Sequence, residues 1–305
     1  ITDIGRYTFF LYVNAGLLEV ENGTLAGNGG EGVRRNGGTA TFRNSILWKN
    51  EDDVLGTVGL EWTDVEDGDG NGTNGCISAH PKFERGLYLT AGSPCENAGG
   101  SNAVDVGLGG YTTRADGTPD GGVLDLGYHA TAGIPAAVAD LYVASGGDNG
   151  NSGTNWAQAF RSVSKALRVA QEGSRVHVAE GTYSNDVETF PLNATRVGLQ
   201  LLGTNRDLTV LDATGTGQRA LDLTDAAFGR VEGLTLRGGG LAQGFYGSGA
   251  GAYLVNADEF VVTSCAVLEN HSGRDGGGMY FYNSADVVVS NCAMVSNTLD
   301  VADRD

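Results

Sequence analysis

The sequence has few basic residues, few prolines and no long hydrophobic run. Its 305 residues include 19 Lys and Arg against 37 Asp and Glu, a formal net charge of −18. A surface this acidic repels phosphate backbones, which argues against nucleic acid as a partner. No run of about 18 apolar residues occurs, so the sequence predicts no transmembrane segment.

Charged residues are scarce too, at 18% of the chain, whereas helix-rich enzymes use more Ala, Leu, Glu and Lys. The chain has 50 glycines and only five prolines, a composition that favours strands joined by many tight corners. Hydrophobic residues make up 40%, which is enough for a packed core. We therefore expect an all-β protein, and the length favours two domains.

A repeat of 15-residue windows occurs in both halves of the chain. Each window begins and ends with Asn, and its fifth, seventh and twelfth positions are apolar or small. The windows are Asn14–Asn28 (NAGLLEVENGTLAGN), Asn36–Asn50 (NGGTATFRNSILWKN), Asn256–Asn270 (NADEFVVTSCAVLEN) and Asn283–Asn297 (NSADVVVSNCAMVSN). Alternation of the fifth and seventh positions is typical of a strand with one inward face.

Each window is interpreted as strand, corner, strand and corner. Asn tolerates the left-handed backbone of a corner, and its side-chain amide can bond to an identical corner in the next coil. One coil cannot bury its inward residues alone, whereas stacked coils can. Regular hairpins of a β-sandwich, the alternative, do not require Asn at both ends of every window. The repeat therefore predicts a parallel β-helix, a solenoid.

The repeat divides the chain into three parts. Residues 1–130 are predicted to be the C-terminal part of one β-helix, with a loop-rich cap after residue 54. Residues 131–139 are small and include a proline, as in a linker. Residues 140–305 are predicted to hold the cap and first coils of a second β-helix. Its capping helix is expected over residues 156–171, with Asn155 as N-cap and one apolar face. That face carries Phe160, Val163, Leu167 and Ala170.

Several segments resemble the ends of a known group. The segment LYVASGGDNGNSGTNWAQAFRSVSKAL, with VHVAEGTY after it, resembles the start of right-handed parallel β-helix repeat proteins with a pectate-lyase-like fold. NGCISAHPKF, YLTAGSPCENAG and DGGVLDLGYHA resemble their C-terminal end, except that His80 replaces an acidic residue before the proline. The resemblance implies an extracellular or cell-surface protein. It implies no single activity, because this scaffold carries lyases, hydrolases, adhesins and structural proteins.

A candidate calcium site lies in the predicted cap. Asp67, Asp69 and Asn71 alternate with glycines, which is the start of a loop that wraps Ca²⁺ with oxygen ligands. The twelfth position is Ser78, where a full loop has a bidentate Glu. The alternative is a solvated acidic turn, and the sequence leaves both interpretations open.

No residue is assigned a catalytic role. Polysaccharide lyases and hydrolases need clustered carboxylates with a base or acid. The nearest cluster, His271, Arg274 and Asp275, lies at a corner between two coils and is interpreted as a solvated ion pair.

The four cysteines fall two in each half. Cys76 and Cys95 lie in the cap, where a disulfide would compensate for a small core, and we expect them to be paired. Cys265 and Cys292 share the tenth window position, so they should stack about 4.8 Å apart. In-register neighbours rarely have disulfide geometry, so we expect buried free thiols.

Both ends of the sequence fall within regular coils. We expect uncovered apolar residues there: Leu18, Val20 and Leu25 at one end, and Val287, Val289 and Met294 at the other. Such coils are prone to pair with another chain, so copies of the protein are predicted to stack head to tail. The same join is covalent if the sequence belongs to a longer repetitive chain. The predicted function is a structural or adhesive extracellular module, and the alternative is a carbohydrate-active or glycan-binding β-helix.

Overall fold

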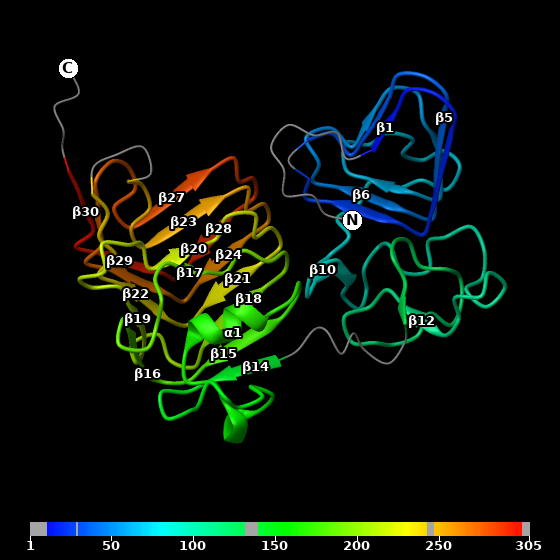
Figure 1. Cartoon of the computed structure of the whole chain (residues 1–305). Coiled ribbons are helices and arrows are strands. Elements are labelled where there is room, and N and C mark those ends of the chain that lie inside the picture. The colour runs from blue at the N-terminus through cyan, green and yellow to red at the C-terminus, as the bar shows by residue number, and fades with distance from the viewer. Residues whose placement is uncertain (1–10, 29, 132–139, 243–246, 301–305) are drawn as a thin grey trace, which may run out of the picture. The chain divides into compact units, whose positions relative to one another are not determined.

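The computed structural model describes residues 11–28, 30–131, 140–242 and 247–300 (Figure 1). The chain divides into two compact units, Ile1–Ala136 and Ala137–Asp305, each described by itself below. Most of the predicted linker, residues 132–139, lies outside the described residues.

Unit 2 is a parallel β-helix with three sheets, and successive coils add one strand to each sheet. The first sheet contains β14 (Asp140–Val143), β15 (Arg175–Val178), β18 (Gln200–Gly203), β21 (Arg230–Glu232), β24 (Val261–Thr263) and β28 (Val288–Ser290). The second contains β16 (Gly181–Ser184), β19 (Thr209–Asp212), β22 (Thr235–Arg237), β25 (Ala266–Leu268) and β29 (Ala293–Val295). The third contains β17 (Leu192–Asn193), β20 (Leu221–Asp222), β23 (Ala252–Val255) and β27 (Met279–Tyr282). A short pair, β26 (His271–Ser272) and β30 (Thr298–Leu299), is also parallel.

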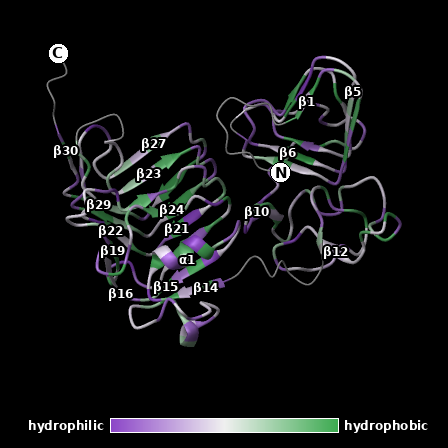
Figure 2. Ribbon diagram, viewed as in Figure 1, coloured by the Kyte–Doolittle hydropathy of each residue, from purple (hydrophilic) through white to green (hydrophobic). Residues whose placement is uncertain are grey.

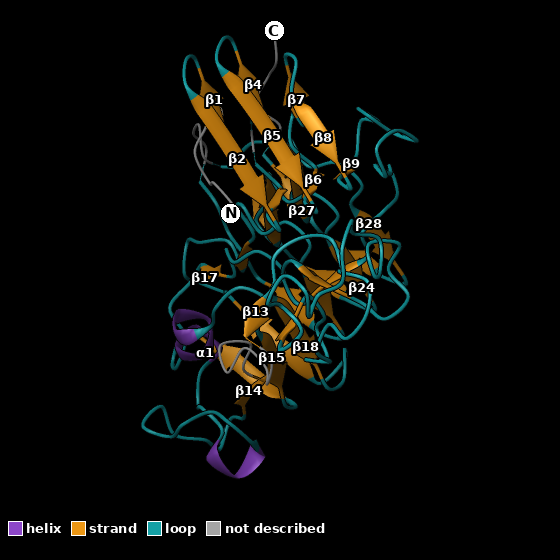
Figure 3. Ribbon diagram, turned by 90° about the vertical axis from the view of Figure 1, so that its right-hand side faces the viewer, coloured by secondary structure: helices purple, strands orange, loops and turns teal. Residues whose placement is uncertain are grey.

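Unit 1 repeats this architecture in three described coils, whose strands lie side by side in Figure 3. Its parallel sheets are β1 (Leu11–Val13), β4 (Val33–Arg35) and β7 (Val54–Leu55); β2 (Leu17–Glu21), β5 (Thr39–Arg43) and β8 (Gly59–Glu61); and β3 (Thr24–Ala26), β6 (Ile46–Trp48) and β9 (Asp64–Val65). The predicted right-handed parallel β-helix is confirmed, and its hand is the one that parallel crossover connections adopt.

The remainder of unit 1 is rich in turns. Two antiparallel pairs punctuate it: β10 (Phe83–Glu84) with β11 (Tyr88–Leu89), and β12 (Tyr111–Thr112) with β13 (Ala130–Thr131). The segment before β13 returns to the β-helix, where the Gly127 amide donates to the Asn44 carbonyl and the Tyr128 amide to Thr24 Oγ1. This segment therefore packs on the solenoid.

The ninth window position forms a corner in all four windows. Asn22, Asn44, Ser264 and Asn291 have φ angles of 54°, 49°, 53° and 50°. Asn is among the few non-glycine residues that adopt this left-handed conformation readily. The repeated corner turns the chain between adjacent sheets at the same point of each coil.

Asparagines at the fifteenth position link successive coils through their side chains. Asn28 Nδ2 donates to Asn50 Oδ1 at 2.7 Å, and Asn270 Nδ2 donates to Asn297 Oδ1 at 2.9 Å. Asn270 also donates to the Leu236 carbonyl of the preceding coil, at 3.2 Å. These bonds satisfy the buried side-chain amides of Asn28 and Asn270 and tie each coil to its neighbour.

The predicted capping helix over residues 156–171 is wrong in its length. The structure has a 3₁₀ turn, η1 (Trp156–Gln158), capped by Asn155, and a separate helix α1 (Val163–Val169), capped by Ser162. Phe160 lies between them in extended backbone: its amide donates to the Tyr142 carbonyl, and its carbonyl accepts from the Ala144 amide. Phe160 therefore covers the outer edge of β14, which interrupts the helix. Neither helix is long and apolar enough to cross a membrane, and no other helix among the described residues is either.

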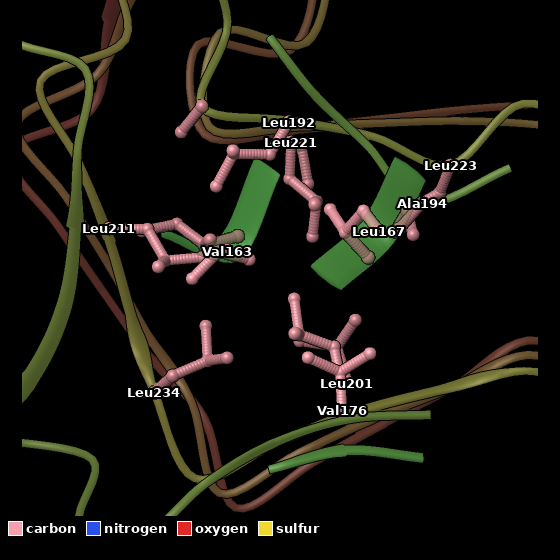
Figure 4. Close-up of a cluster of buried hydrophobic side chains, with 14 of the residues drawn as sticks. Val163, Leu167, Val176, Leu192, Ala194, Leu201, Leu211, Leu221, Leu223 and Leu234 are labelled. Atoms are coloured by element: carbon pink, nitrogen blue, oxygen red, sulfur yellow. The ribbon is translucent and has the colours of Figure 1, made fainter. Parts of the chain in front are cut away.

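Apolar side chains from all three sheets of unit 2 meet inside the solenoid, as the close-up shows (Figure 4). Hydrophobic residues recur along the strands of this unit in the hydropathy colouring (Figure 2). Val176 and Leu201 approach from the first sheet, and Leu211 comes from the second. Val163 and Leu167 of α1 pack against this cluster at its first coils. The helix thus covers the beginning of the core, as a cap should.

Replacing Asn270 with Ala should destabilise unit 2. Asn270 is 0% exposed, and its loss leaves the Leu236 carbonyl and the Gly239 amide without their partner. Unpaired buried groups cost about 1–3 kcal/mol each, so we expect a loss of about 3 kcal/mol. Differential scanning calorimetry of the full chain measures this loss. Asn185→Ala, in an exposed turn after β16, is the control; an equal effect of both substitutions would contradict the role given to the buried ladder.

Candidate functional site

The last described coil of unit 2 presents core-type residues to solvent. Val289 is 40% exposed, whereas Val262, its register partner one coil earlier, is 1% exposed. Met294 is 49% exposed and its partner Val267 is 0% exposed. Val287 is half-buried against the core. We call these three residues the final-coil surface; they face the position that a further coil would occupy.

Side-chain ladders also reach this coil. Asn283 Nδ2 donates to Asn256 Oδ1 at 2.7 Å, and Asn291 Nδ2 donates to Ser264 Oγ at 3.0 Å. In both ladders the amide of the later coil donates to an oxygen of the earlier coil. The carbonyl oxygens of Asn283 and Asn291 are therefore placed to accept from equivalent amides of a further coil.

The opposite end, in unit 1, differs from the prediction. Leu18 and Val20 are half-buried, but Leu25 is only 1% exposed. The expectation that Leu25 lies uncovered is wrong, because its side chain belongs to a closed core cluster with Phe42 and Leu47.

The predicted disulfide between Cys76 and Cys95 is absent, since both are free thiols. Instead, Cys95 Sγ donates to Asp64 Oδ2 at 3.0 Å, while the Ala79 amide donates to Asp64 Oδ1 at the same distance. Burial raises the pKa of the Asp64 carboxyl to about 6. Burial and the Asp64 charge raise the pKa of the Cys95 thiol far above its ordinary value, so this thiol is an unreactive donor.

Cys265 and Cys292 are free thiols at matching points of adjacent coils. Cys265 is buried and Cys292 is half-buried. Each Sγ donates to backbone carbonyls, the shortest contacts being 3.2 Å to Thr263 and 3.1 Å to Ser290. Burial raises the pKa of the Cys265 thiol to about 11, which disfavours the thiolate.

The Asp67–Asn71 loop is an exposed turn whose first carboxylate is engaged locally. Asp67 accepts from the Asp69 amide at 3.2 Å and from the Asp53 amide at 3.3 Å. Among the described residues, no group of three or more His, Cys, Asp or Glu is arranged to hold a metal ion. Calcium binding here stays a prediction.

The corner containing His271, Arg274 and Asp275 does not bring the three side chains into one site. His271 contacts Asp300 Oδ1 at 3.1 Å and Thr298 Oγ1 at 2.9 Å, both in the next coil. Arg274 pairs with its neighbour Asp275 at 3.4 Å on the surface. His271 and Arg274 therefore make separate exposed contacts, the first with the next coil and the second with its sequence neighbour.

One polar cluster was not assigned from the sequence. His129 is buried, and its Nδ1 and Nε2 atoms each lie 3.0 Å from an acceptor, the Gly127 carbonyl and Asp120 Oδ2. Asp120 also accepts from the Asp125 amide, and Asp125 accepts from Thr113. The His129 ring therefore bridges the Gly127 carbonyl and the Asp120 carboxylate inside the cap. Asp120 and His129 are only nine residues apart in the sequence, but only the fold shows that both side chains are buried and in contact.

Comparisons with known proteins extend this description. Residues 144–222, which hold the cap and first coils of unit 2, match a family described as "Protein of unknown function (DUF1565)". No curated protein matches the chain.

Similar solved structures include the pectin methylesterase PemA from Erwinia chrysanthemi, 16% identical with a TM-score of 0.34. Two further pectin methylesterase structures in complex with hexasaccharides are 17% and 16% identical, with TM-scores of 0.34 and 0.35. Each match covers 53% of this chain and 56% of the other, so the chain spans about half the length of those proteins. The resemblance predicted from the sequence is confirmed as that of a parallel β-helix.

Replacing Asp64 with Asn should make unit 1 less sensitive to pH. The folded pKa of about 6 exceeds the unfolded value of about 3.9, so the folded state holds the proton more tightly. This contribution to stability is complete below pH ~4 and is lost as the pH rises to ~6. Relative to wild type, the free energy of unfolding of the variant should therefore rise by about 2 kcal/mol between pH 4 and 7. Urea unfolding at pH 4 and pH 7 measures this difference. Asp105→Asn, at an exposed position, is the control. The same change in the free energy of unfolding with pH for wild type and Asp64→Asn would contradict the prediction.

Calcium should raise the melting temperature if the loop binds it, because a ligand of the folded state stabilises that state. We expect this shift when Ca²⁺ is added to EDTA-treated protein, and its absence in Asp69→Ala. Superimposable melting curves with and without Ca²⁺ would remove the metal from the description of this loop.

Proposed function

We propose that this chain is a structural module of an extracellular or cell-surface protein, and that its final-coil surface is covered by the first coil of a second copy. The exposure of Val289 and Met294, compared with that of their buried counterparts one coil earlier, carries the proposal. An uncovered solenoid coil combines apolar surface with unpaired strand edges, and both favour another chain.

The first coil of unit 1 suits this role by its register. Leu18 and Val20 hold the window positions of Val287 and Val289, and both are half-buried rather than enclosed. Stacked in that register, Asn22 of one copy meets Asn291 of the other, at corners with nearly identical φ angles. Leu25 contributes little to the join because its own core already covers it.

A head-to-tail contact of this kind uses different surfaces on the two copies. It does not close on itself readily, so it extends into an array. In this array, stacks of β-helical coils formed across the joins would alternate with the caps of each chain. Polysaccharide cleavage is not proposed, because His271 contacts Asp300 while Arg274 contacts Asp275, in two separate pairs.

Two adjacent residues of β28 provide a matched test. Val289→Lys places a charge among inward-facing residues and should abolish stacking, since an unpaired charge is costly to bury. The side chain at position 288 points outward, and in the proposed register it faces Glu19 of the next copy. Stacking should therefore persist in Val288→Lys, since opposite charges across neighbouring strands attract.

Sedimentation velocity over a range of concentrations, with electron microscopy of negatively stained samples, measures the outcome. Wild type and Val288→Lys should form concentration-dependent linear assemblies, and Val289→Lys should remain monomeric with an unchanged circular dichroism spectrum. A monomeric wild type at all concentrations, or equal behaviour of the two variants, would contradict the proposed contact.

A further inference from the structure

A polar groove lies beside the cap of unit 2, at the other end of the solenoid from the final-coil surface. Its volume is about 540 Å³, within the range of about 300–1,000 Å³ that is usual for small-molecule sites. One wall is the outer face of α1, and the other is the chain around β17. The residues that concern us are Ser164 and Arg168 of α1, and Thr189, Asn193, Thr195 and Arg196 of the opposite wall.

The groove is basic in a strongly acidic protein. Arg168 and Arg196 line opposite walls, both are exposed, and neither guanidinium has an ion-pair partner among the described residues. Residues 161–168 (RSVSKALR) contain three cations and no acid, although the chain as a whole carries a net charge of −18. Two unpaired guanidinium groups in one concavity present forked donors to an anion.

Glu188, an acid beside the groove, already has its carboxylate oxygens engaged by hydrogen bonds. Its carboxylate accepts from the amides of Val163 and Ser164 at 2.6 and 2.8 Å, and it is buried. The first amides of α1 are therefore satisfied, and the Lys165 amide is capped by Ser162. Recognition of an anion here consequently depends on the arginine side chains rather than on the helix terminus.

We propose that this groove binds a segment of an acidic polysaccharide, with sugar carboxylates on Arg168 and Arg196. The hydroxyl groups of Thr189 and Thr195 and the amide of Asn193 supply neutral partners for sugar hydroxyls. Nucleic acid fits less well, because the rest of the protein is acidic and the groove lining contains no aromatic side chain on which bases could stack.

The experiment uses three probes with the full chain: a trimer of uronic acid residues, the neutral hexose trimer of the same linkage, and inorganic sulfate. Isothermal titration calorimetry should detect the uronate trimer, with binding that weakens as salt is added. Arg168→Ala and Arg196→Ala should each weaken binding about ten-fold, the loss expected for one charge-assisted contact. Both should keep the wild-type melting temperature.

Arg161→Ala is the matched control, because Arg161 is exposed and precedes α1 but does not line the groove. It should bind the uronate trimer as wild type does, and so should Val289→Lys, which separates this site from the proposed assembly contact. Equal binding of the neutral trimer, sulfate binding without uronate binding, or equal losses for Arg161→Ala and Arg168→Ala would each overturn the proposal.

Discussion

In-register stacking of coils is the constraint on which the whole structure depends. A coil of three short strands buries its inward residues only when another coil lies on each side. Val262 is enclosed between neighbouring coils, whereas Val289, at the same position one coil later, is exposed. The cap, the core and the proposed assembly contact all follow from the need to cover both ends of such a stack.

Polar side chains keep the coils in register. Fifteenth-position asparagines bond to the coils before and behind them, and corner asparagines turn the chain where other residues would be strained. Buried carboxylates also accept specific hydrogen bonds. Glu188 accepts from amides of α1, and Asp64 accepts from the Ala79 amide and the Cys95 thiol. These buried polar groups are matched to specific partners, which restricts how the coils can stack.

The two ends of unit 2 have different chemistry. The capping end carries a helix, a polar groove and two arginines that have no ion-pair partner in the described part of the chain. The far end presents apolar residues and asparagine carbonyls. Such a division allows an assembly contact and a ligand site on one solenoid without competition between them. A repeated scaffold of this kind takes its function from what its ends and faces present.

The sequence alone determined the solenoid, because window spacing, apolar alternation and mostly asparagine corners are local signals that recur in four windows, two in each half of the chain. It also placed Cys265 and Cys292 at one point of adjacent coils. Only the tertiary structure decided that Phe160 pairs with the edge of β14 and divides the expected helix. It likewise decided that Cys95 meets Asp64 rather than Cys76, and that the walls of one groove bring Arg168 near Arg196. These contacts join residues from different coils or from the irregular cap, where no repeat specifies the partner.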